Sequence, residues 1–364
     1  MAESRYAASN QLIEEWPELV RNNLGMYIGG NTEIALHNLL KMLVKEVLLD
    51  KTYPSTHIEI ILYADGSYLL NNNADFSQLS LTDIGLVSQW FPGFNPSPTE
   101  WSYAAVANAS AEWFQRVIAT GKTVYRDSFE NVQSARAITV EENTQPTGQT
   151  IHFLPDPTLF IRQDGSAWSY LLDTMRDIAV FSAQHTFRLI NQQLNLETSF
   201  CYPEGLSSYV AELLSNYTNP PEPLAMHTTA GLYQVEVALE WCYADPFFYS
   251  FANSERTIYG GTHVVGFWRG LVAGLKTHIH NTKQGYGKDF HVSQAALQPY
   301  VRGALSVHIP KPIWARAAKV ELANPEIANI VAKTVRNQLP SLLQLQPLLQ
   351  QDVLDSIITK LQRK

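Results

Sequence analysis

Cysteine is scarce in this sequence, and its scarcity excludes two kinds of site. Only Cys201 and Cys242 occur among the 364 residues, and they form no Cys-x-x-Cys pair. Two isolated cysteines cannot build a disulfide framework and do not have the spacing of zinc ligands. We therefore expect a protein of the reducing cytoplasm with no structural metal site.

Long apolar runs are also missing. No stretch reaches the roughly 18 apolar residues of a membrane span. The N-terminus lacks the succession of basic, apolar and small residues that is typical of a signal peptide. We expect neither membrane insertion nor secretion.

Positive charge is in deficit as well. Lys and Arg number 26 against 34 Asp and Glu, which leaves a net charge of −8. Such a chain does not attract nucleic acid through its overall field, so DNA binding is not indicated by charge and would need a local basic patch. The length and the 45% apolar content are sufficient for two domains, each with its own core.

Several segments have a clear hydrophobic period. Residues 31–50 carry apolar side chains three and four apart and predict a helix with one buried face. Residues 57–70 alternate around an Ala-Asp-Gly-Ser turn and predict a hairpin. Residues 104–119 are interpreted as a helix, and 325–364 as mostly helical with interruptions at two prolines, Pro340 and Pro347. Strands joined by helices in both halves indicate two layered domains, with the Pro-rich stretch 219–223 as a linker.

Ordered matches to one family run from about residue 6 to residue 360. The most specific are Gly25-Met26-Tyr27-Ile28-Gly29, the run Val-Glu-Val-Ala-Leu-Glu-Trp at 235–241, and Gly260-Gly261-Thr262-His263. On these residues the chain resembles the B subunits of DNA gyrase and topoisomerase IV (ParE). The resemblance implies an α+β fold. A GHKL (Bergerat) ATPase-like domain with an N-terminal arm would span 1–218, and a ribosomal-S5-like transducer domain would span 224–364 with no cleavage domain after it.

The catalytic helix departs from the family's pattern. In the family a helical Glu activates the attacking water, and an Asn one turn later holds Mg²⁺. The positions that correspond here are Met42 and Glu46, with Lys45 where the family has an Asp. A thioether cannot accept a proton at neutral pH, so general-base catalysis is lost at Met42.

The nucleotide-binding positions are altered too. The resemblance places Asn73 at the family's adenine-reading Asp, and Ala74 and Phe76 where the family has glycines. We expect Phe76 to fill space that a ligand needs. The Thr of the closing strand becomes Gln149.

The glycine lid of the family is replaced as well. Its stretch here is 97–103, which contains Pro98 and Glu100. Proline removes a backbone donor and Glu100 would repel phosphate, so this stretch is ill suited to close on a nucleotide. Lys319 is the one phosphate-reaching group that the resemblance retains, and a solvated surface lysine is the alternative interpretation.

A degenerate nucleotide pocket is therefore predicted, without catalytic residue, metal or cofactor. Its positions are Met42, Lys45, Glu46, Asn73, Ala74, Phe76, Glu100, Gln149 and Lys319. The alternative keeps ATP and Mg²⁺, with Glu46 recruited as the base. Histidines 263, 278, 280 and 291 have no cysteine or acidic partner at ligand spacing and are interpreted as structural or solvated.

The sequence leaves an enzyme and a non-enzyme both open and favours the non-enzyme. Tyr6 matches the tyrosine of the family's dimer arm, so a homodimer is expected. The first hypothesis is a binding protein that regulates a topoisomerase subunit or acts as its decoy. The second is a scaffold in a DNA-processing assembly. The third is a working, ATP-binding and weakly hydrolysing subunit of a type II topoisomerase whose DNA-cleaving parts lie on other chains.

Overall fold

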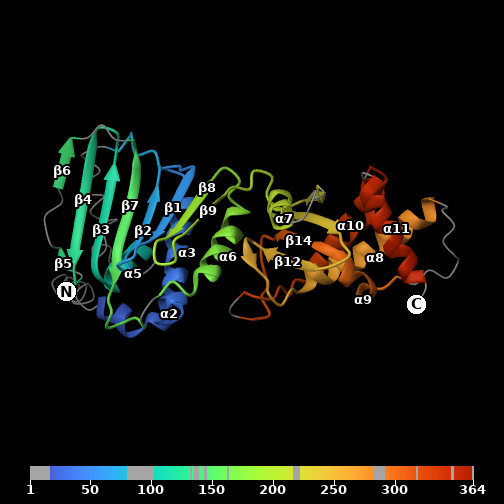
Figure 1. The fold of residues 1–364 in the computed structure, drawn as a ribbon, viewed down its shortest axis with the longest axis horizontal. Coiled ribbons are helices and arrows are strands. Elements are labelled where there is room, and N and C mark those ends of the chain that lie inside the picture. The colour runs from blue at the N-terminus through green and yellow to red at the C-terminus, as the bar shows by residue number, and fades with distance from the viewer. Residues whose placement is uncertain are drawn as a thin grey trace, which may run out of the picture. The chain divides into compact units, whose positions relative to one another are not determined.

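The computed structural model divides the chain into two compact units, Met1–Cys201 and Tyr202–Lys364 (Figure 1). The structure describes residues 17–79, 102–131, 133–134, 139–142, 146–161, 164–215, 222–282, 292–316, 319–345 and 348–362. In this part of the chain no helix combines the length and hydropathy of a membrane span.

A mixed sheet forms the first unit. Nine strands contribute, in the order β5-β4-β3-β7-β2-β1-β8-β9, with β6 paired to β4. All pairs are antiparallel except β1 with β8. The strands are β1 (His57–Leu62), β2 (Tyr68–Asn72), β3 (Ala111–Ala119), β4 (Thr123–Glu130), β5 (Gln133–Ser134), β6 (Thr139–Glu142), β7 (Gly148–Pro155), β8 (Thr186–Asn191) and β9 (Leu196–Phe200).

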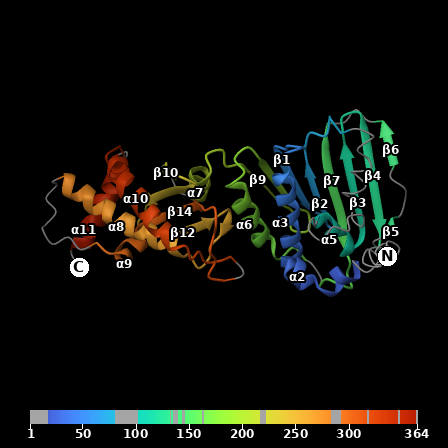
Figure 2. The ribbon, with the colours of Figure 1, turned by 180° about the vertical axis from the view of Figure 1, so that it is seen from behind.

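Helices cover one face of this sheet. Figures 1 and 2 show the sheet and its helices from opposite sides. The helices are α2 (Leu24–Ile28), α3 (Glu33–Leu49), α5 (Tyr103–Ala109) and α6 (Trp168–Ala179). The predicted helix over 31–50 is confirmed as α3, because its apolar stripe packs on α5, α6 and β2. The predicted hairpin over 57–70 is confirmed as β1 and β2.

The helix predicted over 104–119 is wrong in its second half. The helix α5 ends at Ala109, and β3 follows from Ala111 to Ala119. The residues of β3 alternate between buried and partly exposed, and they include aromatic and β-branched side chains such as Trp113 and Val117. That period of two favours a strand once neighbours β4 and β7 are present on both sides.

A five-stranded sheet and helices make up the second unit. The strand order is β10-β11-β14-β12-β13, and β12 and β14 are parallel. The strands are β10 (Leu224–Ala230), β11 (Tyr233–Trp241), β12 (Phe247–Ala252), β13 (Glu255–Arg256) and β14 (Val301–His308). The helices are α7 (Leu206–Leu214), α8 (Thr262–Thr282), α9 (Gln294–Leu297), α10 (Pro325–Leu345) and α11 (Leu348–Gln362), and a 3₁₀ turn η2 (Gln298–Tyr300) precedes β14.

The close pairing of α8 with α10 corrects the prediction for Pro340. This proline lies inside α10 and does not interrupt it. Neighbouring Leu339 is fully buried against α8 near Gly274, so tertiary packing carries the helix past the missing N–H. Pro347 is outside the described residues.

The boundary between the units lies before α7. The sequence places it at 218–224, whereas the compact second unit begins at Tyr202. The reason is that α7 packs on β11 and β14 of the second sheet. Its Leu206 N–H also donates to Glu236 of β11.

Candidate functional site

The candidate site begins on the C-terminal half of α3. Met42, Lys45 and Glu46 are all half-buried there. Met42 and Glu46 lie one helical turn apart, and residues with this spacing share a face. The spacing predicted from the sequence is therefore present in the structure.

Glu46 is hydrogen-bonded to the start of α5. Its Oε1 accepts a hydrogen bond of 2.6 Å from the backbone N–H of Tyr103, the first residue of that helix. Helix N-terminal N–H groups have no partner within the helix and carry partial positive charge, so a carboxylate is stabilised there. The Ser102 hydroxyl accepts from the following N–H, that of Ala104, at 3.2 Å.

Arg116 is the site residue that the sequence reasoning missed. It lies on β3 between the buried residues Phe114 and Ile118 and is only 6% exposed. Directly opposite on β4 stands Asp127. When the Gln149 amide oxygen is turned toward Arg116, it accepts from Nε at 2.6 Å and from Nη2 at 2.7 Å. The signal in the sequence was the alternation across Phe114, Arg116 and Ile118, which the helical interpretation of this segment concealed.

Burial sets the protonation of this cluster. It raises the pKa of Glu46 to about 7, although the Tyr103 N–H and the charge of Arg116 act in the opposite direction. It likewise raises the pKa of Asp127 to about 6. The same burial lowers the pKa of Arg116 to about 10 against the pull of Glu46, Asp127 and Asp50. Attraction within the cluster thus offsets only part of the desolvation cost.

Asn72, the last residue of β2, is buried, whereas the predicted Asn73, which follows it, is exposed. Asn72 is 3% exposed and is the cross-strand partner of Gln149. Asn73 is exposed, and its side-chain oxygen accepts 2.8 Å hydrogen bonds from the N–H groups of Thr56 and His57. Since residues opposite each other share a face, the structure brings Asn72 to Gln149 and leaves Asn73 outside.

The residues at the two glycine positions are packed in the core. Ala74 is 3% exposed and Phe76 is 2% exposed. The Phe76 ring lies 4.6 Å from the ring of Tyr53, centroid to centroid. Both side chains occupy volume that a glycine would leave open.

Lys319 belongs to the second unit, is exposed, and has a left-handed backbone with φ of 57°. Glu100 and Tyr6 lie outside the described residues.

Two features of the cluster oppose the binding of Mg²⁺ at Glu46. Mg²⁺ prefers carboxylate and other hard oxygen ligands, and Glu46, at the position that the resemblance assigns to the metal ligand, is a carboxylate. One Glu46 oxygen is occupied by the Tyr103 N–H, and the nearby Arg116 charge opposes a divalent cation. Within the described ranges no three His, Cys, Asp or Glu side chains are grouped closely enough to hold a metal.

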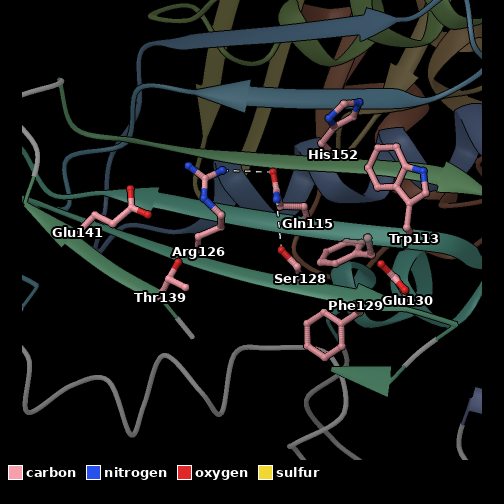
Figure 3. A pocket seen from close by; sticks show the side chains of 10 residues that line it. Trp113, Gln115, Arg126, Ser128, Phe129, Glu130, Thr139, Glu141 and His152 are labelled. Atoms are coloured by element: carbon pink, nitrogen blue, oxygen red, sulfur yellow. Dashed lines mark hydrogen bonds between the residues drawn. The ribbon is translucent and has the colours of Figure 1, made fainter. Parts of the chain in front are cut away.

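A second polar cluster lies on the opposite face of the same sheet (Figure 3). Trp113, Gln115, Arg126 and His152 line a cavity of about 530 Å³ there. The Arg126 guanidinium donates to Gln115 at 3.3 Å, and Trp113 meets His152 edge to face at 4.8 Å. Arg126 is therefore an arginine of the outer face, whereas Arg116 points from β3 toward the helices.

Comparison with protein families finds the DNA gyrase B model over residues 205–364. The chain is 27% identical, over 98% of its length, to the chloroplastic/mitochondrial DNA gyrase B protein of Oryza sativa. It is 28% identical, over 99% of its length, to the DNA gyrase B protein of Synechocystis. The alignments cover 52% and 35% of those proteins, so the chain spans at most about half the length of these relatives.

Solved structures give the same fold. The 43K ATPase domain of Thermus thermophilus gyrase B, in complex with an aminocoumarin, matches with a TM-score of 0.76 and 23% identity, covering 97% of this chain and 96% of that one. The gyrase B protein of Myxococcus xanthus matches with a TM-score of 0.72 and 21% identity, covering 94% and 99%. The predicted α+β fold, a GHKL domain followed by a transducer domain, is confirmed. The chain is a homologue, over nearly its whole length, of the ATPase and transducer region of the gyrase B and topoisomerase IV ParE proteins.

Proposed function

We propose that this chain is a gyrase B-like module that has lost ATP turnover and acts by binding. It serves as a dimeric scaffold, or as a regulator or decoy, of a type II topoisomerase or another DNA-processing assembly. The observation that carries the proposal is the identity and bonding of two residues on α3. Met42 stands at the position that the resemblance assigns to the general base, and Glu46, one turn on, accepts a hydrogen bond from the Tyr103 N–H.

The loss of several groups together supports an absence of turnover better than any single change. A positioned base contributes about 10²–10⁴-fold in rate, and an electrostatic contact to the transition state contributes a similar factor. Met42 cannot act as a base, and the charge of Arg116, which acts on Glu46, opposes a divalent cation at that residue. The combined loss amounts to many orders of magnitude in rate.

Two measurements on the purified chain test this proposal. The first is ATP hydrolysis with Mg²⁺, with and without added gyrase A protein and DNA. The second is the melting temperature with a non-hydrolysable ATP analogue and Mg²⁺. We expect no turnover above background. We also expect no shift in the melting temperature, since a ligand that binds only the folded state would raise it. Turnover that is abolished by replacing Glu46 would refute the proposal.

The mode of action is tested separately. Analytical ultracentrifugation without nucleotide should give a dimer, and gyrase proteins should be retained on the immobilised chain. Partner capture that depends on ATP would contradict binding without nucleotide.

A second candidate is an ATP-binding, weakly hydrolysing subunit that works with separate DNA-cleaving chains. It is favoured by the 27% identity to a gyrase B protein over nearly the whole chain and by the position of Glu46. A carboxyl with a pKa of about 7 is a suitable general base near neutral pH. This candidate predicts slow turnover that Glu46→Gln abolishes and Met42→Ala does not.

A further inference from the structure

The buried charge cluster of the first unit links several elements through one guanidinium. Arg116 of β3 donates two hydrogen bonds to Gln149 of β7 once the Gln149 amide oxygen is turned toward it, and it stands opposite Asp127 of the neighbouring strand β4. Its charge also acts on Glu46 of α3, which in turn accepts from Tyr103 at the start of α5. One guanidinium thus bonds to β7 and acts by its charge on β4 and α3, and Glu46 of α3 is hydrogen-bonded to α5.

Two of these partners stand at positions that the gyrase resemblance assigns to the binding of nucleotide and metal. Gln149 stands at the closing-strand position and Glu46 at the metal-binding position. Asn72, the cross-strand partner of Gln149, lies on the same buried face. A guanidinium is flat, permanently charged and rich in donors, so it can satisfy an amide oxygen and carboxylates at once.

We propose that the Arg116 guanidinium is a built-in occupant of the former nucleotide cleft, and that it holds α5 against α3 through Glu46 without any bound nucleotide. This inference rests on the proposed function, because it takes the cleft to be one that no longer turns over ATP. The inference goes further than the proposed function because it names the Arg116 guanidinium as the group that fills the cleft. The start of α5 is fixed by the protein's own charge in place of a ligand.

Removing the Arg116 side chain should leave a cavity that fits a guanidinium ion. In Arg116→Ala, the Gln149 oxygen and the Glu46 and Asp127 carboxylates lose their cation, so the variant should melt at a lower temperature. Methylguanidinium at millimolar concentration should restore part of that loss. Methylammonium chloride at the same concentration has the same charge without the planar fork and should restore less.

A matched control is available on the neighbouring strand. Arg126 is half-buried on the outer face of the sheet and bonds only one side chain among the described contacts, Gln115 (Figure 3). Arg126→Ala should lower the melting temperature less and should gain nothing selective from methylguanidinium. Equal rescue of both variants would show a non-specific effect and overturn the inference.

A double-mutant cycle covers the case in which Arg116→Ala does not fold. Arg116→Met removes the charge and keeps much of the volume, and Glu46→Gln neutralises the carboxylate while keeping an acceptor for the Tyr103 N–H. If the two side chains act together, Arg116→Met lowers the melting temperature less in the Glu46→Gln background than in the wild type. Equal losses in both backgrounds would overturn the inference, and a double variant that folds where Arg116→Met does not would support it.

The nucleotide measurement separates this inference from the proposed function. Wild type should give no melting-temperature shift with Mg²⁺ and a non-hydrolysable ATP analogue. A shift without turnover would overturn the occupied cleft and leave the loss of hydrolysis standing. Turnover by the wild type would overturn both.

Discussion

At the scale of single residues, Glu46 decides how the site responds to pH. Burial raises its pKa to about 7, from an ordinary value of 4.5. The folded state therefore binds more protons than the unfolded state between these two values. The free energy of unfolding contributed by this group is greatest below pH 4.5, falls as the pH rises toward 7, and is constant above.

Glu46→Gln should remove this dependence. The variant keeps an acceptor for Tyr103 and carries no charge to bury, so above pH 7 it should be more stable than the wild type, by on the order of 2 kcal/mol. Below pH 4.5 the two proteins should be nearly equal. Urea denaturation of both proteins from pH 4 to pH 8 measures the difference. A difference that does not change with pH would contradict the assigned environment of Glu46.

The shared face of the two helix residues could be predicted, and the inward-facing residues of the strands could not. Met42 and Glu46 were placed correctly relative to each other because a spacing of four on a helix fixes a shared face. The sequence predicts Asn73 as a pocket residue, but Asn72 is the residue that faces inward. A shift of one residue along a strand reverses the face on which a side chain lies. Arg116 was missed because its segment was interpreted with a helical period.

At the scale of elements, the α8–α10 pair depends on a row of glycines. Gly266, Gly270 and Gly274 recur every four residues along α8 and allow the backbone of α10 to approach closely. A Cβ at Gly266 would lie 2.4 Å from the Ala328 carbonyl oxygen, which is backbone and cannot turn aside. A Cβ at Gly274 would meet first the Leu339 Cδ2 at 3.1 Å.

Gly266→Ala should therefore cost more stability than Gly274→Ala. Overpacking against backbone typically costs about 1–3 kcal/mol or more. At Gly274 the flexible end of Leu339 can adjust, and the higher helix propensity of alanine returns up to about 1 kcal/mol. Chemical denaturation of the two variants tests this order. If Gly274→Ala is the more damaging change, the close approach at Gly266 is not what holds the pair together.

Elements were predictable where their own sequence period agrees with their environment. The helix α3 and the hairpin of β1 and β2 carry clear periods and were found. The strand β3 follows directly on α5 with only Ser110 between them, so no turn residue such as Gly or Pro marks the change. Pro340 was taken as a break because the packing that carries α10 past it is tertiary and leaves no local signal.

At the scale of the whole molecule, the division into two units determines which fragments should fold alone. The second unit has its own core of apolar side chains from its sheet and from α8, α10 and α11. The helix α7 adds four buried residues, Leu206, Tyr209, Val210 and Leu214. A fragment that starts at the linker predicted from the sequence would lose this helix and expose the strands beneath it.

Fragment 202–364 should therefore unfold cooperatively on its own, and fragment 224–364 should be markedly less stable. Burying one large apolar side chain contributes roughly 1.5–3 kcal/mol, so losing the buried face of α7 removes several kcal/mol from a unit of this size. The Glu236 carboxylate would also lose the Leu206 N–H from which it accepts a hydrogen bond. Thermal unfolding of both fragments, followed by circular dichroism, measures the difference. If the two fragments melt alike, α7 does not belong to the second unit's core, and the boundary lies at the Pro-rich segment that the sequence indicates.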